Sequence, residues 1–372
     1  MSDKEVVDLR NKNIVVIYML YFGDMISLSP FLSVLRRNAL NSHISLVVDS
    51  RFQESVLYNP NIDQVIPVDR KHMNMMDTWR FGIQLGEEIQ PDILIVLHST
   101  LRTLAMGLGM HAAYWTGEAS NWIGKLLMNQ VLTVERKDCH AAEKYVQFLA
   151  ELGGVTDTSY KGLELYTCPE WEKAAAVFYQ KHGIIKENVD RGTTKLIGFS
   201  VGSSTAEKNW PAERYGQLAE HFIRLGYIPV FFGIPSERPL IDQAMSAISN
   251  PSNAVVAAGE LSMGEFMAAA SWCRAAFTND SGPMYVFDSR GVPTIAVFGP
   301  SNARLHHPLG NRSCAIASTD MPQTQDHVGH TIRNKAYVPI DHISLNDVLR
   351  AGEWALGLRK SDTYKNHFVV VK

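Results

Sequence analysis

Cysteine, long apolar runs and an excess of one charge are all scarce in this sequence. The four cysteines (Cys139, Cys168, Cys273 and Cys314) are widely separated, with no C-x-x-C pair and no histidine at ligand spacing. They are typical of reduced, mostly buried thiols in a cytoplasmic protein, and not of a disulfide framework or a zinc site. The net charge of −3 gives no sign of nucleic-acid binding.

No segment predicts export or a membrane span. Residues 1–13 are polar and charged, without the apolar core of a secretory signal. The longest early apolar run, Ile14–Phe22, is too short to cross a bilayer and is typical of a buried strand. Any membrane association of this chain is therefore expected to be peripheral.

The length of 372 residues, with 46% apolar and 20% charged residues, gives room for two globular cores. In the first half, short apolar runs alternate with amphipathic stretches. The runs predict strands at Ile14–Met19, Ser45–Val48, Val65–Val68, Asp92–Leu97 and Ala112–Trp115. The stretches predict a helix that follows the turn Gly23-Asp24 and runs through about Leu40, and further helices over Met76–Ile89 and Ala141–Leu152.

A second alternating series follows a polar region at about 155–194. It predicts strands at Lys195–Ser200, Ile228–Phe232, Val255–Ala258, Ala275–Thr278 and Thr294–Phe298, and helices at Glu170–His182, Pro211–Leu225, Glu237–Ile248, from Ser262 onward and at Leu345–Leu358. Strands separated by helix-length segments imply crossovers and parallel sheets. The sequence predicts an α/β protein with two Rossmann-like domains, 1–168 and 169–372, and ligands beyond the carboxyl ends of the strands. It leaves open that the last helix packs back on the first domain.

The stretch Phe277–Pro300 is the most informative part of the chain. A short apolar strand leads into the turn Asn279–Gly282, whose residue types cap helices, and Pro283 suits a first helical turn. Gly291 and Pro293 then end the helix before another apolar strand. A helix N-terminus at the carboxyl end of a buried strand attracts anions, because unpaired N–H groups and the positive end of the helix dipole meet there.

This stretch resembles the signature of the lipopolysaccharide heptosyltransferases, glycosyltransferase family 9, in which an Asp-Ser/Thr-Gly-x-x-His run precedes a Gly-Val-Pro-x-x-x-x-Phe-Gly-Pro run. Tyr285 occupies the position of the histidine, and further landmarks extend the resemblance from about Ile14 to Pro308. It implies the GT-B architecture, in which an acceptor-binding domain and a nucleotide-sugar-binding domain with parallel sheets face each other across a cleft. The matching residues are Asp280, Ser281, Gly282, Gly291, Val292, Pro293, Phe298, Gly299 and Pro300.

Gly23 and Asp24 follow the first predicted strand, where an aspartate either projects toward a ligand or caps the next helix. On spacing alone, capping is the commoner role. The family pattern of Gly-Asp before a helix with Ser-Pro and Leu-Arg-Arg is matched by Ser29-Pro30 and Leu35-Arg-Arg37. The resemblance implies that Asp24 is the general base, which a carboxylate can be without any tuning of its pKa.

A hydroxyl-rich loop, Gly202–Pro211, follows the strand that opens the second series. Hydroxyls, backbone N–H groups and a lysine beside a helix N-terminus can cradle a phosphate, although a capped surface loop with a solvated lysine is commoner. The family's Lys-x-Trp-Pro motif is matched here, which implies that Lys208 contacts a diphosphate and that Ser203 and Ser204 line it.

Glu237 comes four residues after Gly233, at the end of a predicted strand. An acid there accepts hydrogen bonds from ribose hydroxyls in dinucleotide folds, and a glutamate favoured by the helix dipole is an equally good explanation. The resemblance favours Glu237 as the ribose partner and adds Ser281, Gly282 and Tyr285 to the donor site. Asp280 would bond sugar hydroxyls or hold the turn, because a carboxylate repels phosphate.

Two motifs are absent. Without an Asp-x-Asp motif we expect no metal to hold the diphosphate, and no cofactor. Without Gly-x-Gly-x-x-Gly after the first strand, a nicotinamide-dependent dehydrogenase is disfavoured. Most of the histidines near strand ends, His98, His306 and His307, are interpreted as surface or packing residues.

The resemblance implies an inverting, metal-independent glycosyltransferase that transfers a heptose from ADP-heptose to a lipopolysaccharide core acceptor. Asp24 would withdraw the acceptor proton, while Lys208 and its loop stabilise the departing ADP. The expected place is the cytoplasm, with peripheral contact at the inner face of the inner membrane left open. Two alternatives remain: transfer of heptose or another sugar to protein hydroxyls, and a nucleotide-sugar-binding protein without turnover.

Overall fold

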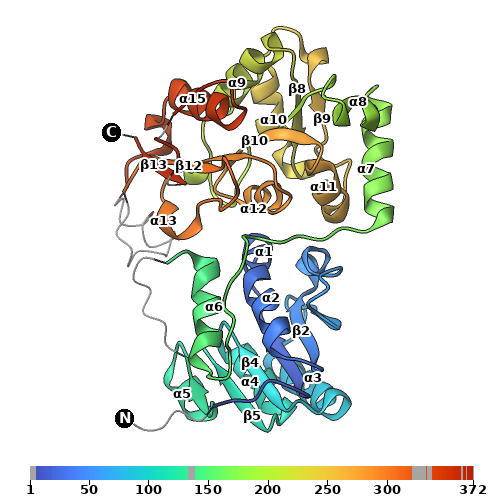
Figure 1. Ribbon diagram of the computed structural model, residues 1–372, viewed down its shortest axis with the longest axis vertical. Helices are drawn as coiled ribbons and strands as arrows, with labels where there is room; N and C mark the ends of the chain where they lie inside the picture. The colour runs from blue at the N-terminus through green and yellow to red at the C-terminus, as the bar shows by residue number, and fades with distance from the viewer. Residues whose placement is uncertain are drawn as a thin grey trace. The chain divides into compact units, whose positions relative to one another are not determined.

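The computed structural model describes residues 6–132, 139–320, 332, 337–361, 363–365 and 367–371. The chain folds as two compact units, one comprising residues 1–136 and 141–161 and the other residues 137–140 and 162–372 (Figure 1). Each unit is built on one sheet in which every described strand pair is parallel. The predicted α/β class with two Rossmann-like sheets is confirmed.

The sheet of the first unit has the strand order β3-β2-β1-β4-β5-β6. The chain reverses its direction of travel through the sheet between β1 and β4, which creates a switch point where ligands of such folds bind. The strands are β1 (Asn13–Ile17), β2 (His43–Asp49), β3 (Gln64–Val68), β4 (Ile93–Val96), β5 (Tyr114–Gly117) and β6 (Gln130–Val131). The helices are α1 (Phe22–Ser27), α2 (Ser29–Asn38), α3 (Met75–Ile89), α4 (Leu101–Met110), α5 (Trp122–Leu127) and α6 (Ala141–Glu151), with a short 3₁₀ helix η1 (Ser50–Ser55).

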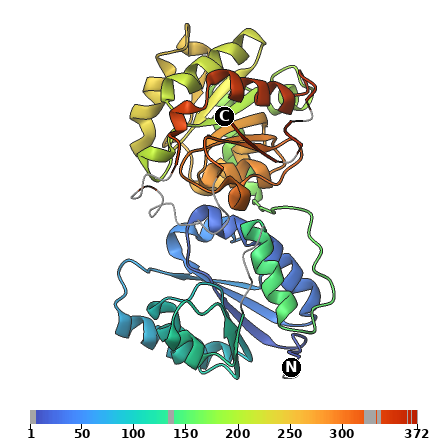
Figure 2. The ribbon, with the colours of Figure 1, turned by 90° about the vertical axis from the view of Figure 1, so that its left-hand side faces the viewer.

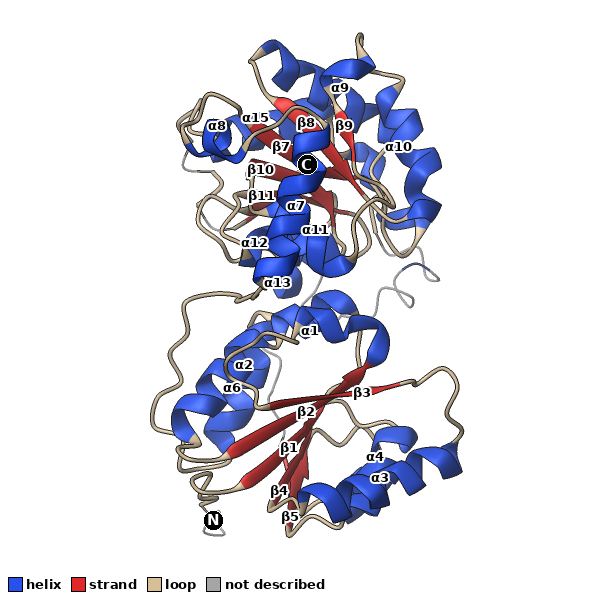
Figure 3. Cartoon of the chain, turned by 90° about the vertical axis from the view of Figure 1, so that its right-hand side faces the viewer, coloured by secondary structure: helices blue, strands red, loops and turns tan. Residues whose placement is uncertain are grey.

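Helices cover both faces of this first sheet (Figure 3). On one face, Phe31 of α2 and Phe148 of α6 pack against Ile14 of β1. On the other face, Leu85 of α3 and Leu104 of α4 join a separate apolar cluster. Central strands buried on both sides lose the polar alternation of a half-exposed strand, which is why they appear in the sequence as continuous apolar runs.

The predicted turn at Gly23-Asp24 lies inside α1, and the helix predicted after it, through about Leu40, is divided between α1 and α2. Pro30 stands in the first turn of α2 and has no N–H to donate to the carbonyl of Ile26. The hydroxyl of Ser29 donates to that carbonyl instead, at 2.7 Å. The Ser-Pro pair therefore ends one helix and starts the next, and the single-helix prediction was wrong.

The sheet of the second unit has the order β13-β12-β11-β10-β7-β8-β9, with its switch point between β7 and β10. The strands are β7 (Leu196–Ser200), β8 (Ile228–Phe232), β9 (Val255–Val256), β10 (Cys273–Asn279), β11 (Thr294–Phe298), β12 (Cys314–Ala317) and β13 (Phe368–Val370). The helices are α7 (Pro169–Lys181), α8 (Lys186–Asp190), α9 (Ala212–Arg224), α10 (Arg238–Met245), α11 (Met263–Ala270), α12 (Gly282–Ser289), α13 (Ala303–His306) and α15 (Leu345–Ala355). Short 3₁₀ helices are η2 (Ala206–Lys208), η3 (Pro235–Glu237), η4 (Pro251–Asn253) and η5 (Ile340–His342).

The core of the second unit is rich in aromatic rings. Phe199 of β7 stacks on Phe231 of β8 and Phe277 of β10, with ring centroids 5.0 and 5.3 Å apart. Helix α15 crosses this face, drawn in red in Figure 2, and its Gly352 lies against the ring of Phe277. On the opposite face, Gly198 leaves room for Phe287 of α12, because a Cβ there would meet the ring at 2.6 Å.

Local sequence signals predicted the start of a helix more reliably than the ends of strands. The helix predicted from Ser262 onward is confirmed as α11, and a capping box starts it: Ser262 Oγ accepts from the backbone N–H of Glu265, and Glu265 Oε2 accepts from the backbone N–H of Ser262. The fifth strand of the first unit runs over Tyr114–Gly117 and not over Ala112–Trp115. Strands β6, β12 and β13 were not predicted.

Within the described ranges, no helix has the length and apolar character needed to cross a membrane.

Candidate functional site

The switch point of the second sheet brings two sequence motifs together. Strand β7 pairs with β8 on one side and with β10 on the other. The segments that leave the carboxyl ends of β7 and β10 therefore emerge side by side. The first segment is the hydroxyl-rich loop Gly202–Pro211, and the second is the turn Asp280–Gly282 that opens α12.

Asn279, the last residue of β10, fastens the two segments to each other. Its Oδ1 accepts from the backbone N–H of Trp210 at 3.0 Å and from the hydroxyl of Tyr215 at 2.8 Å, and its Nδ2 donates to the carbonyl of Val201 at 2.8 Å. The side chain is fully buried. Sequence reasoning treated Asn279 only as a turn residue. An amide can both donate and accept, so it suits a buried junction of this kind.

Lys208 and Asp280 form an ion pair at this junction. Lys208 Nζ lies 2.5 Å from Asp280 Oδ2, and the two side chains are only 12% and 9% exposed. Burial raises the pKa of Asp280, but the charges of Lys208 and His306 and the hydrogen bond from Lys208 outweigh it, so that the pKa lies below its ordinary value of 3.8. An ammonium group has three N–H donors, so Lys208 can keep this pair and still donate to phosphate oxygens.

The two serines of the loop have different surroundings. Ser203 Oγ lies 2.8 Å from the carbonyl of Thr205 and 2.7 Å from Oδ1 of Asn209, so its single hydroxyl proton is used within the loop. Ser204 is exposed. Ser203 thus supports the shape of the loop, while Ser204 presents its side chain at the surface.

Glu237 reaches the same edge of the sheet from η3. Its Oε2 accepts from the backbone N–H of Ile234 at 2.9 Å. Its carboxylate fits against two glycines: a Cβ on Gly202 would lie 2.0 Å from Oε1, and one on Gly233 would lie 2.8 Å from Oε2. Burial raises the pKa of Glu237, and the Ile234 N–H offsets only part of that rise. The carboxylate therefore lies beside the loop of β7, and its contact with a ribose stays a prediction.

Helix α12 begins at this edge with Ser281 as its N-cap residue and Gly282 as its first residue. The hydroxyl of Ser281 is 3.4 Å from the carbonyl of Asn279. Tyr285, in the second turn, is 7% exposed, and its hydroxyl lies 3.3 Å from Nδ1 of His306 on α13. The N-terminus of α12 adds the backbone N–H of Gly282 and the positive end of the helix dipole beside Lys208.

Asp24 belongs to the first unit and lies after β1, at the switch point of that sheet. It is partly buried, and its Oδ2 accepts from the backbone N–H of Tyr21 at 3.2 Å. The capping role considered from the sequence is therefore present. A carboxylate has two oxygens with several acceptor positions, so this bond is compatible with a further role as a base.

Comparison with known proteins places the chain in a family. The sequence profile of glycosyltransferase family 9 (heptosyltransferase) matches residues 79–336, well over half of the sequence. The chain belongs to glycosyltransferase family 9. A crystal structure of a family 9 glycosyltransferase from Veillonella parvula DSM 2008 is 35% identical in sequence, covers 95% of this chain and 100% of its own, and superposes with a TM-score of 0.87.

More distant relatives cover nearly the same length of this family 9 chain. Lipooligosaccharide heptosyltransferase 2 of Haemophilus influenzae is 24% identical over 313 residues, which span 82% of this chain and 88% of the relative. The Escherichia coli heptosyltransferase WaaC, solved with ADP, is 16% identical, covers 88% of this chain and 99% of its own, and has a TM-score of 0.66. The predicted resemblance and the two-sheet architecture of GT-B heptosyltransferases are thereby confirmed.

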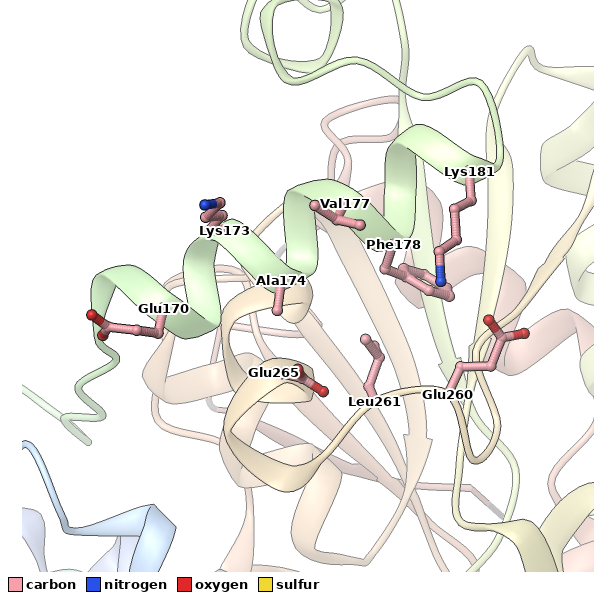
Figure 4. A pocket seen from close by; sticks show the side chains of 9 residues that line it. All are labelled: Glu170, Lys173, Ala174, Val177, Phe178, Lys181, Glu260, Leu261 and Glu265. Carbon is pink, nitrogen blue, oxygen red and sulfur yellow. The ribbon is translucent and has the colours of Figure 1, made fainter.

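A hollow in the second unit of the family 9 chain lies between α7 and the loop before α11 (Figure 4). Its walls carry both charges, from three glutamates and two lysines, and Glu265 Oε2 already accepts from the backbone N–H of Ser262. It therefore lacks the positive character that a phosphate requires, and the switch point is the better candidate. The lining residues are Glu170, Lys173, Ala174, Val177, Phe178, Lys181, Glu260, Leu261 and Glu265.

Proposed function

We propose that this family 9 chain is an inverting, metal-independent heptosyltransferase that transfers a heptose from ADP-heptose to a lipopolysaccharide core acceptor. The observation that supports the proposal most is the gathering of Lys208, Asp280, Glu237 and the N-terminus of α12 at one switch point. This is where a doubly wound sheet binds a nucleotide.

The charges and hydrogen-bond donors of the second unit support a donor site there. Lys208 and the backbone N–H of Gly282 at the start of α12 would hold the diphosphate, with Ser204 contributing a hydroxyl from the loop. Glu237 would accept from the ribose hydroxyls. WaaC of the same fold was solved with ADP, which supports an adenine nucleotide as the ligand here.

The reaction would be a single displacement. Asp24 takes the proton of an acceptor hydroxyl, the acceptor oxygen forms a bond to the anomeric carbon from the face opposite the leaving group, and the bond between that carbon and the diphosphate oxygen breaks. Inversion of the anomeric configuration follows from the single displacement. The released ADP gains negative charge, which Lys208 and the helix N-terminus stabilise without a metal ion.

The relatives named as lipopolysaccharide and lipooligosaccharide heptosyltransferases support a saccharide acceptor of the cell envelope. We place the reaction in the cytoplasm, with the acceptor presented at the inner face of the inner membrane and the enzyme in peripheral contact with it.

The test is to incubate the full chain with a panel of nucleotide sugars and with heptose-deficient lipopolysaccharide core, and to measure product masses. The proposal predicts that one heptosyl residue is added to the core from ADP-heptose and that ADP is released. Addition only from other nucleotide sugars, or only to protein hydroxyls, would contradict it. ADP binding without product from any donor would indicate a binding protein.

A further inference from the structure

The charges at the proposed donor site do not suffice for a diphosphate if Lys208 acts alone. Lys208 and Asp280 carry opposite charges 2.5 Å apart, so the pair contributes almost no net charge. Glu237 adds a carboxyl group on the same edge. A diphosphate has several negative charges, and its binding requires a further group that donates hydrogen bonds or carries positive charge.

His306 is well placed to be that group. It is the last residue of α13, which follows β11, and β11 pairs in parallel with β10. The segments after β10 and β11 therefore leave the sheet at the same edge. Two observations place the imidazole beside the donor site: Nδ1 lies 3.3 Å from the Tyr285 hydroxyl, and the charge of His306 contributes to lowering the pKa of Asp280.

Tyr285 stands where the heptosyltransferase motif has histidine, and a phenol at that position stays neutral and has a single O–H. Through its contact with His306, Tyr285 holds an imidazole close to the motif position. When the tyrosine hydroxyl donates to Nδ1, the ring proton of a neutral imidazole lies on Nε2, which makes Nε2 a donor. In that arrangement, Nε2 is the nitrogen of His306 that can donate to a phosphate oxygen.

The neighbouring imidazoles do not have this character. His140 Nε2 donates to the carbonyl of His307 at 2.9 Å, and His307 Nδ1 donates to the carbonyl of Pro308 at 3.0 Å. Burial holds the pKa of His140 well below its ordinary value of 6.5 and lowers that of His307 to about 4, so both rings are neutral at pH 7. His306 is partly exposed, as is His307, whereas His140 is buried.

We propose that His306 is a donor-site residue whose imidazole contacts the diphosphate, and that Tyr285 is its positioning residue. The imidazole that the family motif supplies from α12 is then supplied in this chain from α13. The inference rests on the proposed nucleotide-diphosphate site and adds a residue that the motif does not contain.

The test measures the affinities of the full chain for ADP and for adenosine, which lacks the diphosphate, by titration calorimetry. His306→Ala should weaken ADP binding about 10- to 100-fold, the effect of losing one charge-assisted hydrogen bond, and leave adenosine binding unchanged. Arg304→Ala is the matched control: it removes a cation from the same helix, but Arg304 pairs with Asp320 and should affect neither ligand.

The double variant Tyr285→His/His306→Ala tests whether ADP binding depends on an imidazole or only on the packing of the His306 side chain. It restores an imidazole at the motif position and should recover most of the ADP affinity that His306→Ala loses. Unchanged ADP binding in His306→Ala, an equal loss for both ligands, or no recovery in the double variant would overturn the proposal. If the wild-type chain binds ADP no better than adenosine, the proposed function itself fails.

Discussion

The buried pair of Lys208 and Asp280 gives the most quantitative prediction for the second unit. Its side chains are about nine-tenths buried, so removing one partner leaves the other as an uncompensated charge. For pairs of this kind the loss of one partner costs about 3–5 kcal/mol. Because both side chains keep a little exposure, we expect Lys208→Met and Asp280→Asn each to lower the free energy of unfolding by about 3 kcal/mol.

The double variant Lys208→Met/Asp280→Asn removes both charges. It should cost about as much as one single substitution, which gives a coupling energy of roughly 3 kcal/mol between the two sites. The control is the pair Lys186–Asp190 on α8, whose side chains are 45% and 60% exposed and whose coupling should stay below about 0.5 kcal/mol. Additive single effects at Lys208 and Asp280 would refute the reasoning.

The assay must report on the second unit alone, because the chain has two. Hydrogen exchange in increasing urea, followed by mass spectrometry of peptides from β7 and β10, meets this need. The pH dependence gives an independent check. A carboxyl group whose pKa is lowered by folding stabilises the protein above its ordinary pKa of 3.8. The gap between the wild-type chain and Asp280→Asn should therefore be constant near neutral pH and shrink as the pH falls below 3.8 through the lowered value.

Substitutions of Glu237 and of Asp24 give two further predictions. Burial raises the pKa of Glu237 above 4.5, so its ionised form is penalised at neutral pH. Glu237→Gln should therefore raise the melting temperature at pH 7, lose that advantage below pH 4.5, and weaken ADP binding by up to about tenfold. A lower melting temperature of this variant at pH 7 would contradict the prediction. Asp24→Ala should abolish transfer and leave ADP affinity nearly intact in calorimetry, whereas equal loss of both would remove Asp24 from the role of base.

Much of the fold was predictable because the central strands are buried on both faces. The runs that became β1, β4, β7 and β11 are continuously apolar and lie close to their predicted bounds. Strand β13 was missed because its Phe368–Val370 segment gains its place only by pairing with β12. Such a short edge strand depends on contacts that the local sequence does not show.

The candidate site was predictable residue by residue but not as an arrangement. Lys208 and Asp280 were each singled out, yet their ion pair depends on β7 and β10 being neighbours. No local sequence pattern predicts the strand order of a sheet. The same applies to His306, which was interpreted with most strand-end histidines as a surface or packing residue and lies 3.3 Å from Tyr285.

The central claim is that the carboxyl edge of the second sheet binds a nucleotide through its diphosphate, with Lys208 as a direct contact. Titration calorimetry of ADP and adenosine on the wild-type chain and on Lys208→Met tests it most directly. We predict that the wild-type chain prefers ADP, and that Lys208→Met weakens ADP about 10- to 100-fold while adenosine binding is unchanged. Equal affinity of the wild-type chain for the two ligands, or an equal loss of both in Lys208→Met, would contradict the account.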